Sequence, residues 1–390
     1  MKNNFIFSIF LIPLFFDTKK NSMKLSSRKP DAKRLMDVLA GKIKTQEVQL
    51  MELSIDPTIL KKYSEHYLKR TWVDYDRSDK EKRALYWDNV ILCYESLGYS
   101  GFRVSNGLIF PFSTKEAHEN SSVSNKNRKW SDHNGLISDE KSFEDYPWPT
   151  LEDVDLFDYK YVSEHLPEGM GIFACVFGGI FEMVCEYLVG FEKLCFMSLE
   201  QPELMEKIIK KTGDLLLDVY RMIVKIPKVV CIFQGDDFGY TEGLMFPPEF
   251  YHAHILPWHK RLADIAHNAG LLYILHSCGN LRDLGNSLFE FGMDAKHSFE
   301  DKGWSVIDFY KEHSDKTGVV GGVDVDKLCR LPKPELEAYC KKILDACHEH
   351  GRYAFGSGNS IPNYVPFENF LTMLEVAKKH SISPTPPCSL

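Results

Sequence analysis

The stretch YILHSCGNLRD, residues 273–283, places a histidine and a cysteine two positions apart. His276 and Cys278 close an apolar run, and a Gly-Asn pair follows them at once. In a strand, alternate side chains lie on one face, so the imidazole and the thiol would point in the same direction. Imidazole and thiolate are good zinc ligands. The stretch therefore predicts two ligands of a zinc site; the alternative is an ordinary histidine and free cysteine in the core.

A catalytic zinc also needs a third protein ligand and one open position. Residues suited to be that ligand stand at the ends of other apolar runs: Asp237, His297, Asp324 and Asn359. Asp236 precedes Asp237, and we expect one of this pair to face the site while the other caps the next helix by accepting from its amides. Three glutamates on a helical pattern are expected to be solvated or structural: Glu182, Glu186 and Glu192.

Eight short apolar runs, most of them followed by a helical pattern, supply the elements that would position these side chains. The runs are 47–53, 99–105, 171–178, 228–237, 271–279, 293–300, 317–324 and 353–359. Two of the segments between them begin with proline and end with glycine, as helices do. Strands that alternate with helices pair in parallel, and eight of them predict a (β/α)8 TIM barrel. An open doubly wound sheet is the alternative, but no G-x-G-x-x-G follows a strand.

In such a barrel the site lies at the carboxyl ends of the strands. The fourth run ends in Gln234, Asp236 and Asp237, the fifth in His276 and Cys278, and polar residues end the later runs as well. The sequence therefore predicts that these side chains surround one central point.

Composition narrows the classes of function. The 390 residues carry a net charge of −8 without a basic block, which argues against a nucleic-acid partner and favours a small-molecule substrate. None of the ten cysteines forms a C-x-x-C pair, which indicates reduced thiols and a cytoplasmic location.

The amino-terminal residues 1–22 are a separate question. The apolar stretch from Phe5 to Phe16 is too short to span a membrane, and no small-x-small cleavage site follows it. These residues are either a signal-like segment, which would make the protein exported or membrane-anchored, or a spurious extension before a true start at Met23.

The remainder is expected to be one barrel domain. We predict that this domain covers residues 23–380, has no membrane partner, and precedes a tail at 381–390. A long polar insert at about 106–170 interrupts it, and a loop of this length is a functional lid or a disordered excursion. The sequence leaves the oligomeric state open, with a homodimer as one option.

From about residue 30 to 375, the sequence resembles the uroporphyrinogen decarboxylase superfamily, whose fold is a (β/α)8 barrel. The segments that carry the resemblance are YPWP (146–149), FGGIFEMVCEYLVGFEKLCFMSLEQPELMEKII (177–209), GDDFGYTEGLMFPPEFYHAHILPWHKRLADIAHNAG (235–270), LHSCGN (275–280), HSFED (297–301), GGVDV (321–325) and GSGNSIPNYVP (356–366). Together they are specific to the superfamily.

The decarboxylase branch carries an Arg-rich motif after its first strand and an Asp after its second. Here the corresponding segments are MELSIDPTILKKYSEHYL, which has no arginine, and RVSNGLIF, which has no aspartate. A tetrapyrrole with many carboxylates would then leave buried anions unpaired, and Arg103 alone is a poor replacement. Cofactor-free decarboxylation in porphyrin biosynthesis is therefore the alternative function.

The other branch comprises methyltransferases that move a methyl group from a corrinoid protein to a thiol. Their zinc is held by a His-x-Cys pair, matched here by His276 and Cys278, and by a Cys in a GPGC-like turn, where this chain has Asn359 in GSGN. The resemblance implies a zinc-dependent methyltransferase with a thiol or pterin acceptor and a corrinoid supplied by a partner protein. A non-catalytic corrinoid- or tetrapyrrole-binding protein is a second alternative.

Residue roles complete this hypothesis. Zinc would be held by His276, Cys278 and Asp237. The catalytic groups would be Asp237, His297 and Asp324, and the substrate would contact Gln234, Asn359 and Arg103.

Overall fold

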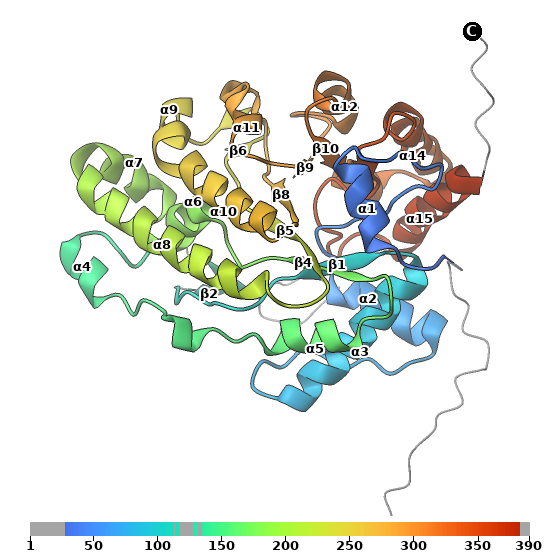
Figure 1. Cartoon of the computed structure of the whole chain (residues 1–390), viewed down its shortest axis with the longest axis horizontal. Helices are drawn as coiled ribbons and strands as arrows, with labels where there is room; N and C mark the ends of the chain where they lie inside the picture. Colours follow the sequence, from blue (N-terminus) through green and yellow to red (C-terminus); the bar gives the residue numbers. More distant parts are fainter. Residues whose placement is uncertain (1–27, 113, 118–127, 132–134, 383–390) are drawn as a thin grey trace, which may run out of the picture.

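A parallel seven-stranded sheet forms the centre of the protein, with helices packed around it (Figure 1). The computed structural model describes residues 28–112, 114–117, 128–131 and 135–382. The strand order is β1-β4-β5-β8-β9-β10-β11, and every neighbouring pair is parallel. The strands are β1 (Gly101–Val104), β4 (Gly171–Ala174), β5 (Val229–Gly235), β8 (Leu272–His276), β9 (Ala295–His297), β10 (Gly318–Val320) and β11 (Tyr353–Ala354).

The first predicted strand, residues 47–53, occupies the eighth position by a looser form of pairing. Leu50 forms an isolated parallel bridge with Phe355, just beyond β11, and Met51 N–H donates to the Phe355 carbonyl over 3.0 Å. On its other side, Glu52 accepts a hydrogen bond from the hydroxyl of Tyr99, just before β1. This segment therefore lies between the two edge strands and completes a (β/α)8 barrel, as predicted.

Apolar side chains fill the interior of the barrel toward the amino-terminal ends of its strands. One buried cluster contains lumen-facing residues of the strands, among them Phe173, Cys231, Phe233 and Ile274. Leu35, Met36 and Leu39 of α1 (Ala32–Leu39) belong to the same cluster, so this helix closes the amino end of the barrel. The polar strand ends above this layer are left to form a site.

Helices cover the outside of the barrel, and the larger buried cluster lies between them and the sheet. They are α2 (Pro57–Tyr63), α3 (Lys80–Leu97), α5 (Phe157–His165), α6 (Ile180–Glu182), α7 (Phe191–Glu200), α8 (Pro202–Ile223), α9 (Pro248–Phe250), α10 (Leu256–Asn268), α11 (Ser287–Glu290), α12 (Val306–His313), α13 (Val325–Arg330), α14 (Lys333–Cys347) and α15 (Phe367–Ile382). Short π-helical and 3-10 turns extend or link several of them: η1 (Ser64–Leu68), η2 (Leu151–Asp153), η3 (Met183–Leu188), η4 (Tyr251–Ile255) and η5 (Arg282–Leu284).

Local sequence explains where the long helices begin and end. The Asp79 side chain accepts from the first free amides of α3, and Gly98 ends that helix in a left-handed conformation. Proline stands in the first turn of α8, α10 and α14, where its missing N–H costs nothing. Of the two helices predicted from proline and glycine, the one that ends before Gly351 is α14, whereas the segment that ends at Gly270 is divided into α9, η4 and α10.

The insert between the second and third predicted strands contains structure of its own. Its described part holds the antiparallel pair β2 (Thr114–Ala117) and β3 (Arg128–Ser131), then α4 (Glu140–Asp145), η2 and α5. Residues 1–22 lie outside the described residues, and the last helix runs two residues past the predicted end of the domain at 380. A second small pair, β6 (Gly239–Tyr240) and β7 (Gly243–Leu244), follows β5.

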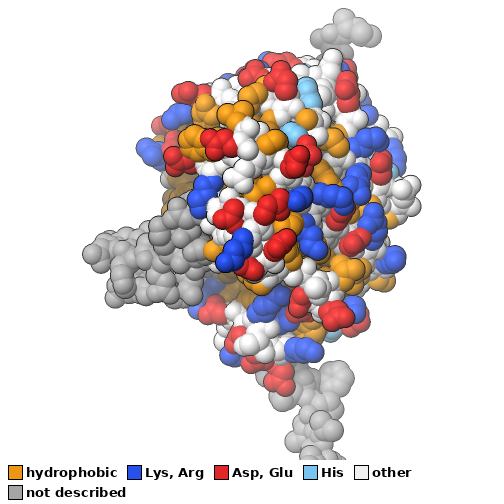
Figure 2. All heavy atoms as spheres, turned by 90° about the vertical axis from the view of Figure 1, so that its left-hand side faces the viewer, with side chains coloured by type: hydrophobic (Ala, Val, Ile, Leu, Met, Phe, Trp, Pro, Cys, Tyr) orange, Lys and Arg blue, Asp and Glu red, His pale blue; other side chains and the backbone are white. Residues whose placement is uncertain are grey.

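Acidic, basic and apolar side chains are interspersed over the face that includes α7 (Figure 2). Within the described ranges all nine cysteines are free, as expected for a chain without a disulfide framework. Of the helices in that part of the chain, none is both long and apolar enough to cross a membrane.

Candidate metal centre

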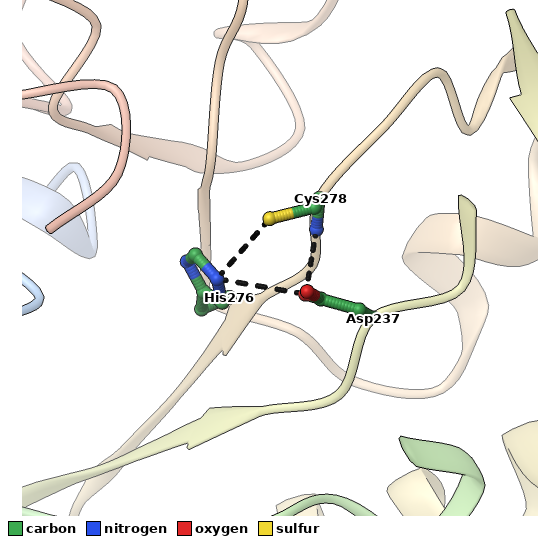
Figure 3. Close-up of side chains that lie close together, drawn as sticks. All are labelled: Asp237, His276 and Cys278. Atoms are coloured by element: carbon green, nitrogen blue, oxygen red, sulfur yellow. Dashed lines mark hydrogen bonds and ion pairs between the residues drawn. The ribbon is translucent and has the colours of Figure 1, made fainter. Parts of the chain in front are cut away.

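Asp237, His276 and Cys278 converge at the carboxyl end of the barrel (Figure 3). Asp237 lies two residues past β5, His276 ends β8, and the parallel register pairs Gly235 with His276. His276 Nε2 is 3.5 Å from Asp237 Oδ1 and 3.6 Å from Cys278 Sγ. The backbone N–H of Cys278 donates to Asp237 Oδ1 over 2.9 Å, which holds the two loops together.

These separations suit a tetrahedral zinc ion. With metal–ligand bonds of about 2.0–2.3 Å, tetrahedral N, O and S ligands lie roughly 3.3–3.6 Å from one another. All three candidate ligand atoms lie within 4.8 Å of one another, and the two distances from the imidazole nitrogen fall in or close to that narrower range. A cysteine, a histidine and a carboxylate would leave the fourth position open, which is the pattern of a catalytic zinc.

A second histidine sets the orientation of His276. His297 Nε2 is 3.1 Å from the carbonyl oxygen of Ser357, so this nitrogen carries the proton and donates. His297 Nδ1 is then an acceptor, and it receives the Nδ1 proton of His276 over 2.7 Å. This chain of hydrogen bonds leaves the lone pair of His276 on Nε2, the nitrogen that faces Asp237 and Cys278.

Burial keeps both imidazoles neutral, as this chain requires. It lowers the pKa of His276 well below its ordinary value, with the neighbouring His297 as the next cause. Burial also lowers the pKa of His297 to about 3. Two neutral rings can share one proton between their Nδ1 atoms, whereas two imidazolium ions could not.

Without a cation nearby, the charged forms of Asp237 and Cys278 are both disfavoured. Burial raises the pKa of Asp237 above its ordinary value, and burial together with the charge of Asp237 raises that of the Cys278 thiol. A divalent cation reverses this preference, because it stabilises the thiolate and the carboxylate that bind it. The charges of one zinc ion, one thiolate and one carboxylate then sum to zero in a partly buried site.

Asn359 lies against the sulfur of the cluster. Its Nδ2 is 3.3 Å from Cys278 Sγ, and its Oδ1 accepts the backbone N–H of Ser360 over 2.8 Å. The amide therefore turns its donor toward the sulfur, where an N–H stabilises a thiolate. The hydroxyl of Ser298 approaches the same sulfur at 3.8 Å.

The turn that carries Asn359 is anchored by a buried glutamate. Both carboxyl oxygens of Glu52 lie 3.1 Å from the backbone nitrogen of Ser357, and Oε2 also contacts the Ser357 hydroxyl. Burial raises the pKa of Glu52 to about 8, so the carboxyl is largely protonated at neutral pH. A protonated carboxyl donates to the serine hydroxyl, which in turn donates to the Asn359 carbonyl.

Of the two neighbouring aspartates, only Asp237 faces the cluster, as we expected for one of the pair. Asp236 is fully buried and accepts from the backbone amides of Ile180, Phe181 and Glu182 and from His259 Nε2. The expectation that the second aspartate caps the next helix was wrong. It caps α6, an earlier helix, because the loop after β4 packs against the end of β5.

Gln234 does not fit the predicted contact with substrate. Its side chain is fully buried, because it alternates with the lumen-facing Phe233 and Gly235 and so points out of the barrel. Its amide nitrogen donates to the carbonyl of Gly178 over 2.8 Å, and its oxygen accepts from the Tyr220 hydroxyl. All the polar capacity of this side chain is used inside the protein.

Asp324 and His297 were predicted to be catalytic, but both side chains form hydrogen bonds inside the protein that give them structural roles. Asp324 caps α13, and its oxygens accept from the backbone amides of Asp301 and Lys327 over 2.9 and 3.2 Å. It lines a cavity of about 780 Å³ that Asn359 also borders. Both nitrogens of His297 are engaged, so it supports His276 and is not itself free to bind a metal.

Two further charged residues lie in this region: Glu182, for which the sequence suggested another role, and Lys296, which the sequence analysis did not predict. Glu182 was expected to be structural or solvated, but burial and the charge of Asp237 raise its pKa well above the ordinary value. Lys296 is fully buried, donates to the Ser298 carbonyl over 2.6 Å, and has a pKa lowered by burial to about 7. A lone lysine inside the apolar run of β9 is the signal that could have identified it.

A parallel barrel with a polar cluster at its carboxyl end defines the class of (β/α)8 enzyme-like proteins. The family model described as uroporphyrinogen decarboxylase (URO-D) matches residues 159–380, more than half of the chain. The chain therefore belongs to this family. No curated protein matches the chain significantly.

Solved structures extend the similarity of fold. A methyltransferase from Methanosarcina mazei superposes with a TM-score of 0.66 at 15% identity, covering 89% of this chain and 97% of that one. A B12-independent methionine synthase from Shewanella sp. W3-18-1 reaches a TM-score of 0.49 at 10% identity, covering 86% of this chain and 97% of that one.

Proposed function

We propose that this protein is a zinc-dependent methyltransferase that moves a methyl group from a corrinoid protein or another methylated donor to a thiol or pterin acceptor. The observation that carries the proposal is the cluster of Asp237, His276 and Cys278, with the lone pair of His276 Nε2 directed toward the other two ligand atoms. The similarity in fold to a protein described as a methyltransferase supports it.

The residues of the chain would divide the work as follows. His276, Cys278 and Asp237 would hold the metal, and zinc, when bound, would supply the charge that keeps an acceptor thiol ionised at neutral pH. His297 orients His276, and Asn359 donates to the Cys278 sulfur. The cluster is partly buried, with His276 buried and Asp237 and Cys278 half-buried, which limits the access of bulk water to the acceptor sulfur.

Methyl transfer would then be a single displacement. The acceptor thiol loses its proton to solvent on binding, and its sulfur attacks the methyl carbon of the donor. A sulfur–carbon bond forms as the cobalt–carbon bond of a methylcorrinoid breaks, and the electron pair stays on cobalt. The role of the protein is to bring the two reactants together in line.

Methylcobalamin and 2-mercaptoethanol provide a direct test with the purified protein. Loss of the methyl–cobalt absorption and mass-spectrometric detection of the methyl thioether would support the proposal if His276→Ala abolishes both. Tetrahydrofolate replaces the thiol in a parallel arm. Equal rates with wild type, His276→Ala and no protein for both acceptors would overturn the proposal.

Decarboxylation of a tetrapyrrole is the second candidate, because the chain belongs to the family named for that reaction. Incubation with uroporphyrinogen III and product analysis tests it. Loss of carboxyl groups by the wild type would favour it over methyl transfer. Capture of a corrinoid protein without turnover in either assay would favour a binding function.

A further inference from the structure

Arg103 places a guanidinium in the lumen beside the candidate metal centre. The side chain preceding it on β1, Phe102, packs outward against Trp87 and Tyr94. Arg103 therefore faces inward by alternation. A methyl group built on Gly235 would lie 3.9 Å from Arg103 Nη1 and 3.7 Å from His276 Cδ2. The guanidinium and the imidazole thus border one space, which is large enough to accept a methyl group without a clash.

The polar atoms of Arg103 are not all used inside the protein. Its Nε is buried and has no hydrogen-bond partner among the residues that the structure describes. A buried donor without an acceptor is costly, and native proteins rarely leave one. A guanidinium offers Nε and one Nη side by side, a fork that matches the two oxygens of a carboxylate. Nε forms such a fork with Nη2, and Nη1 forms a second one with Nη2 at the end of the guanidinium. Because Nη1 is the atom that borders the space above Gly235, an anion in that space would bind the second fork.

An aromatic wall stands at the rim of the same end of the barrel. It is formed by Phe112, Phe177 and Tyr187, whose ring centroids are 5.0–6.2 Å apart. Phe177 follows β4 and is 39% exposed, a large fraction for a side chain of this size. Burial is the main cause that raises the pKa of the Tyr187 hydroxyl, and the charges of Glu182 and Asp237 act in the same direction, as expected for a ring near the cluster. A flat apolar group fits against these rings.

We propose that the lumen binds an organic acid, with its carboxylate held by Arg103 in the space above Gly235 and its flat apolar part against Phe112, Phe177 and Tyr187. This deepens the proposed function, because it names the chemistry of a ligand that shares the lumen with the candidate metal centre. Binding of the acid itself does not require the metal. The nearby Glu182, whose raised pKa keeps it neutral, does not repel the anion.

The probe is 3-phenylpropionate, which carries a carboxylate and a ring, and its affinity is measured by titration with the full-length protein. The neutral 3-phenylpropan-1-ol and the ringless propionate are the comparison ligands. We expect the wild type to bind 3-phenylpropionate at least about tenfold more tightly than either of them. Arg103→Met should remove the preference for the acid over the alcohol.

Two glycine variants form a matched pair that does not depend on removing a charge. Gly235→Ala fills the space between Arg103 and His276 and should weaken binding of 3-phenylpropionate about tenfold or more. Gly243→Ala, which has no atom closer than 4.0 Å to the added methyl group, should bind like the wild type. Neither glycine has a positive φ, so both substitutions are compatible with the backbone.

Equal affinity of the wild type for the acid and the alcohol, or no binding of either, would overturn the proposal. The same conclusion follows if Arg103→Met and Gly235→Ala both bind the acid like the wild type, because water would then be a sufficient partner for Arg103. Zinc content is measured in the same preparations. A wild type that lacks zinc but binds the acid through Arg103 would contradict the proposed function and leave this inference standing.

Discussion

The Nδ1 atoms of His276 and His297 lie 2.7 Å apart, at the ends of two adjacent parallel strands. This contact joins a residue of the candidate metal cluster to a second ring whose other nitrogen donates to the Ser357 carbonyl. The proton order along this chain determines which nitrogen of His276 presents its lone pair to the cluster. In the proposed zinc site, the histidine pair would therefore prepare the cluster for a cation.

Zinc content is the first prediction. Wild-type protein should be isolated with about one zinc per chain, and His276→Ala should lose most of it, because the cluster then keeps two ligands. Elemental analysis measures this. His252→Ala is the matched control, since His252 is exposed and its imidazole contacts the Ser287 hydroxyl and no residue of the cluster. Equal zinc in the wild type and His276→Ala would contradict the assignment of the ligand.

His297→Phe should weaken zinc binding without removing a ligand. The phenyl ring has a similar shape but cannot accept the His276 Nδ1 proton, so the orientation and tautomer of His276 are no longer held. Loss of such a supporting contact typically costs 10–100-fold in metal affinity. Competition with a chromogenic chelator measures the change. An affinity equal to that of the wild type would show that the hydrogen bond between the two rings does not prepare the site.

Asn359→Cys should bind zinc more tightly than the wild type, about tenfold or more, because a thiolate would replace a neutral amide 3.3 Å from Cys278 Sγ. In cobalt-substituted protein the added ligand should strengthen the sulfur-to-metal absorption band. Asn359→Ser, which supplies no thiolate, is the control and should not show either gain. A cysteine variant that behaves like the serine variant would place residue 359 outside coordinating range.

Asp236 and Asp237 should have opposite effects on stability and on metal content. Asp236→Ala removes the acceptor of three backbone amides and His259, so we expect a loss of about 3 kcal/mol or more in the free energy of unfolding. Asp237→Ala should change stability by only about 1 kcal/mol but lower zinc content. Chemical denaturation and elemental analysis of both variants measure the difference, and the reverse pattern would refute it.

Glu52 should make stability fall as pH rises. Its pKa of about 8 in the folded protein exceeds its ordinary value of 4.5, so between these pH values the folded state holds a proton that the unfolded state has released. The contribution to the free energy of unfolding then falls by at most about 1.4 kcal/mol per pH unit. Glu52→Gln keeps a neutral donor at this position but cannot ionise.

The denaturation midpoints of wild type and Glu52→Gln, measured from pH 5 to pH 8.5, isolate this contribution because the other titrating groups are common to both. The denaturation midpoint of Glu52→Gln should rise steadily relative to that of the wild type as pH rises. A difference between the two proteins that is the same at every pH would mean that Glu52 does not titrate in this range.

The barrel itself could be predicted because its signals are local. Each apolar run is bounded by turn residues, and the helices α3, α8, α10 and α14 each have a capping residue or a proline in the first turn, so neighbouring residues contain the information. The first run is the partial exception. Within residues 47–53 one isolated bridge, Leu50 with Phe355, joins the run to the segment after β11, because the first and last parts of the barrel meet there and the pairing depends on how the whole barrel closes.

The amino-acid sequence by itself determined the parallel barrel, its polar strand ends, and the shared face of His276 and Cys278, since the period of a strand fixes which side chains point together. Only the tertiary structure decided that Asp237 and not Asp236 faces the cluster, and that His297 supports His276. It also decided that Arg103 lies beside His276. These outcomes depend on the register of strands that are many residues apart. No local pattern contains that register, because it is set by the packing of the complete barrel.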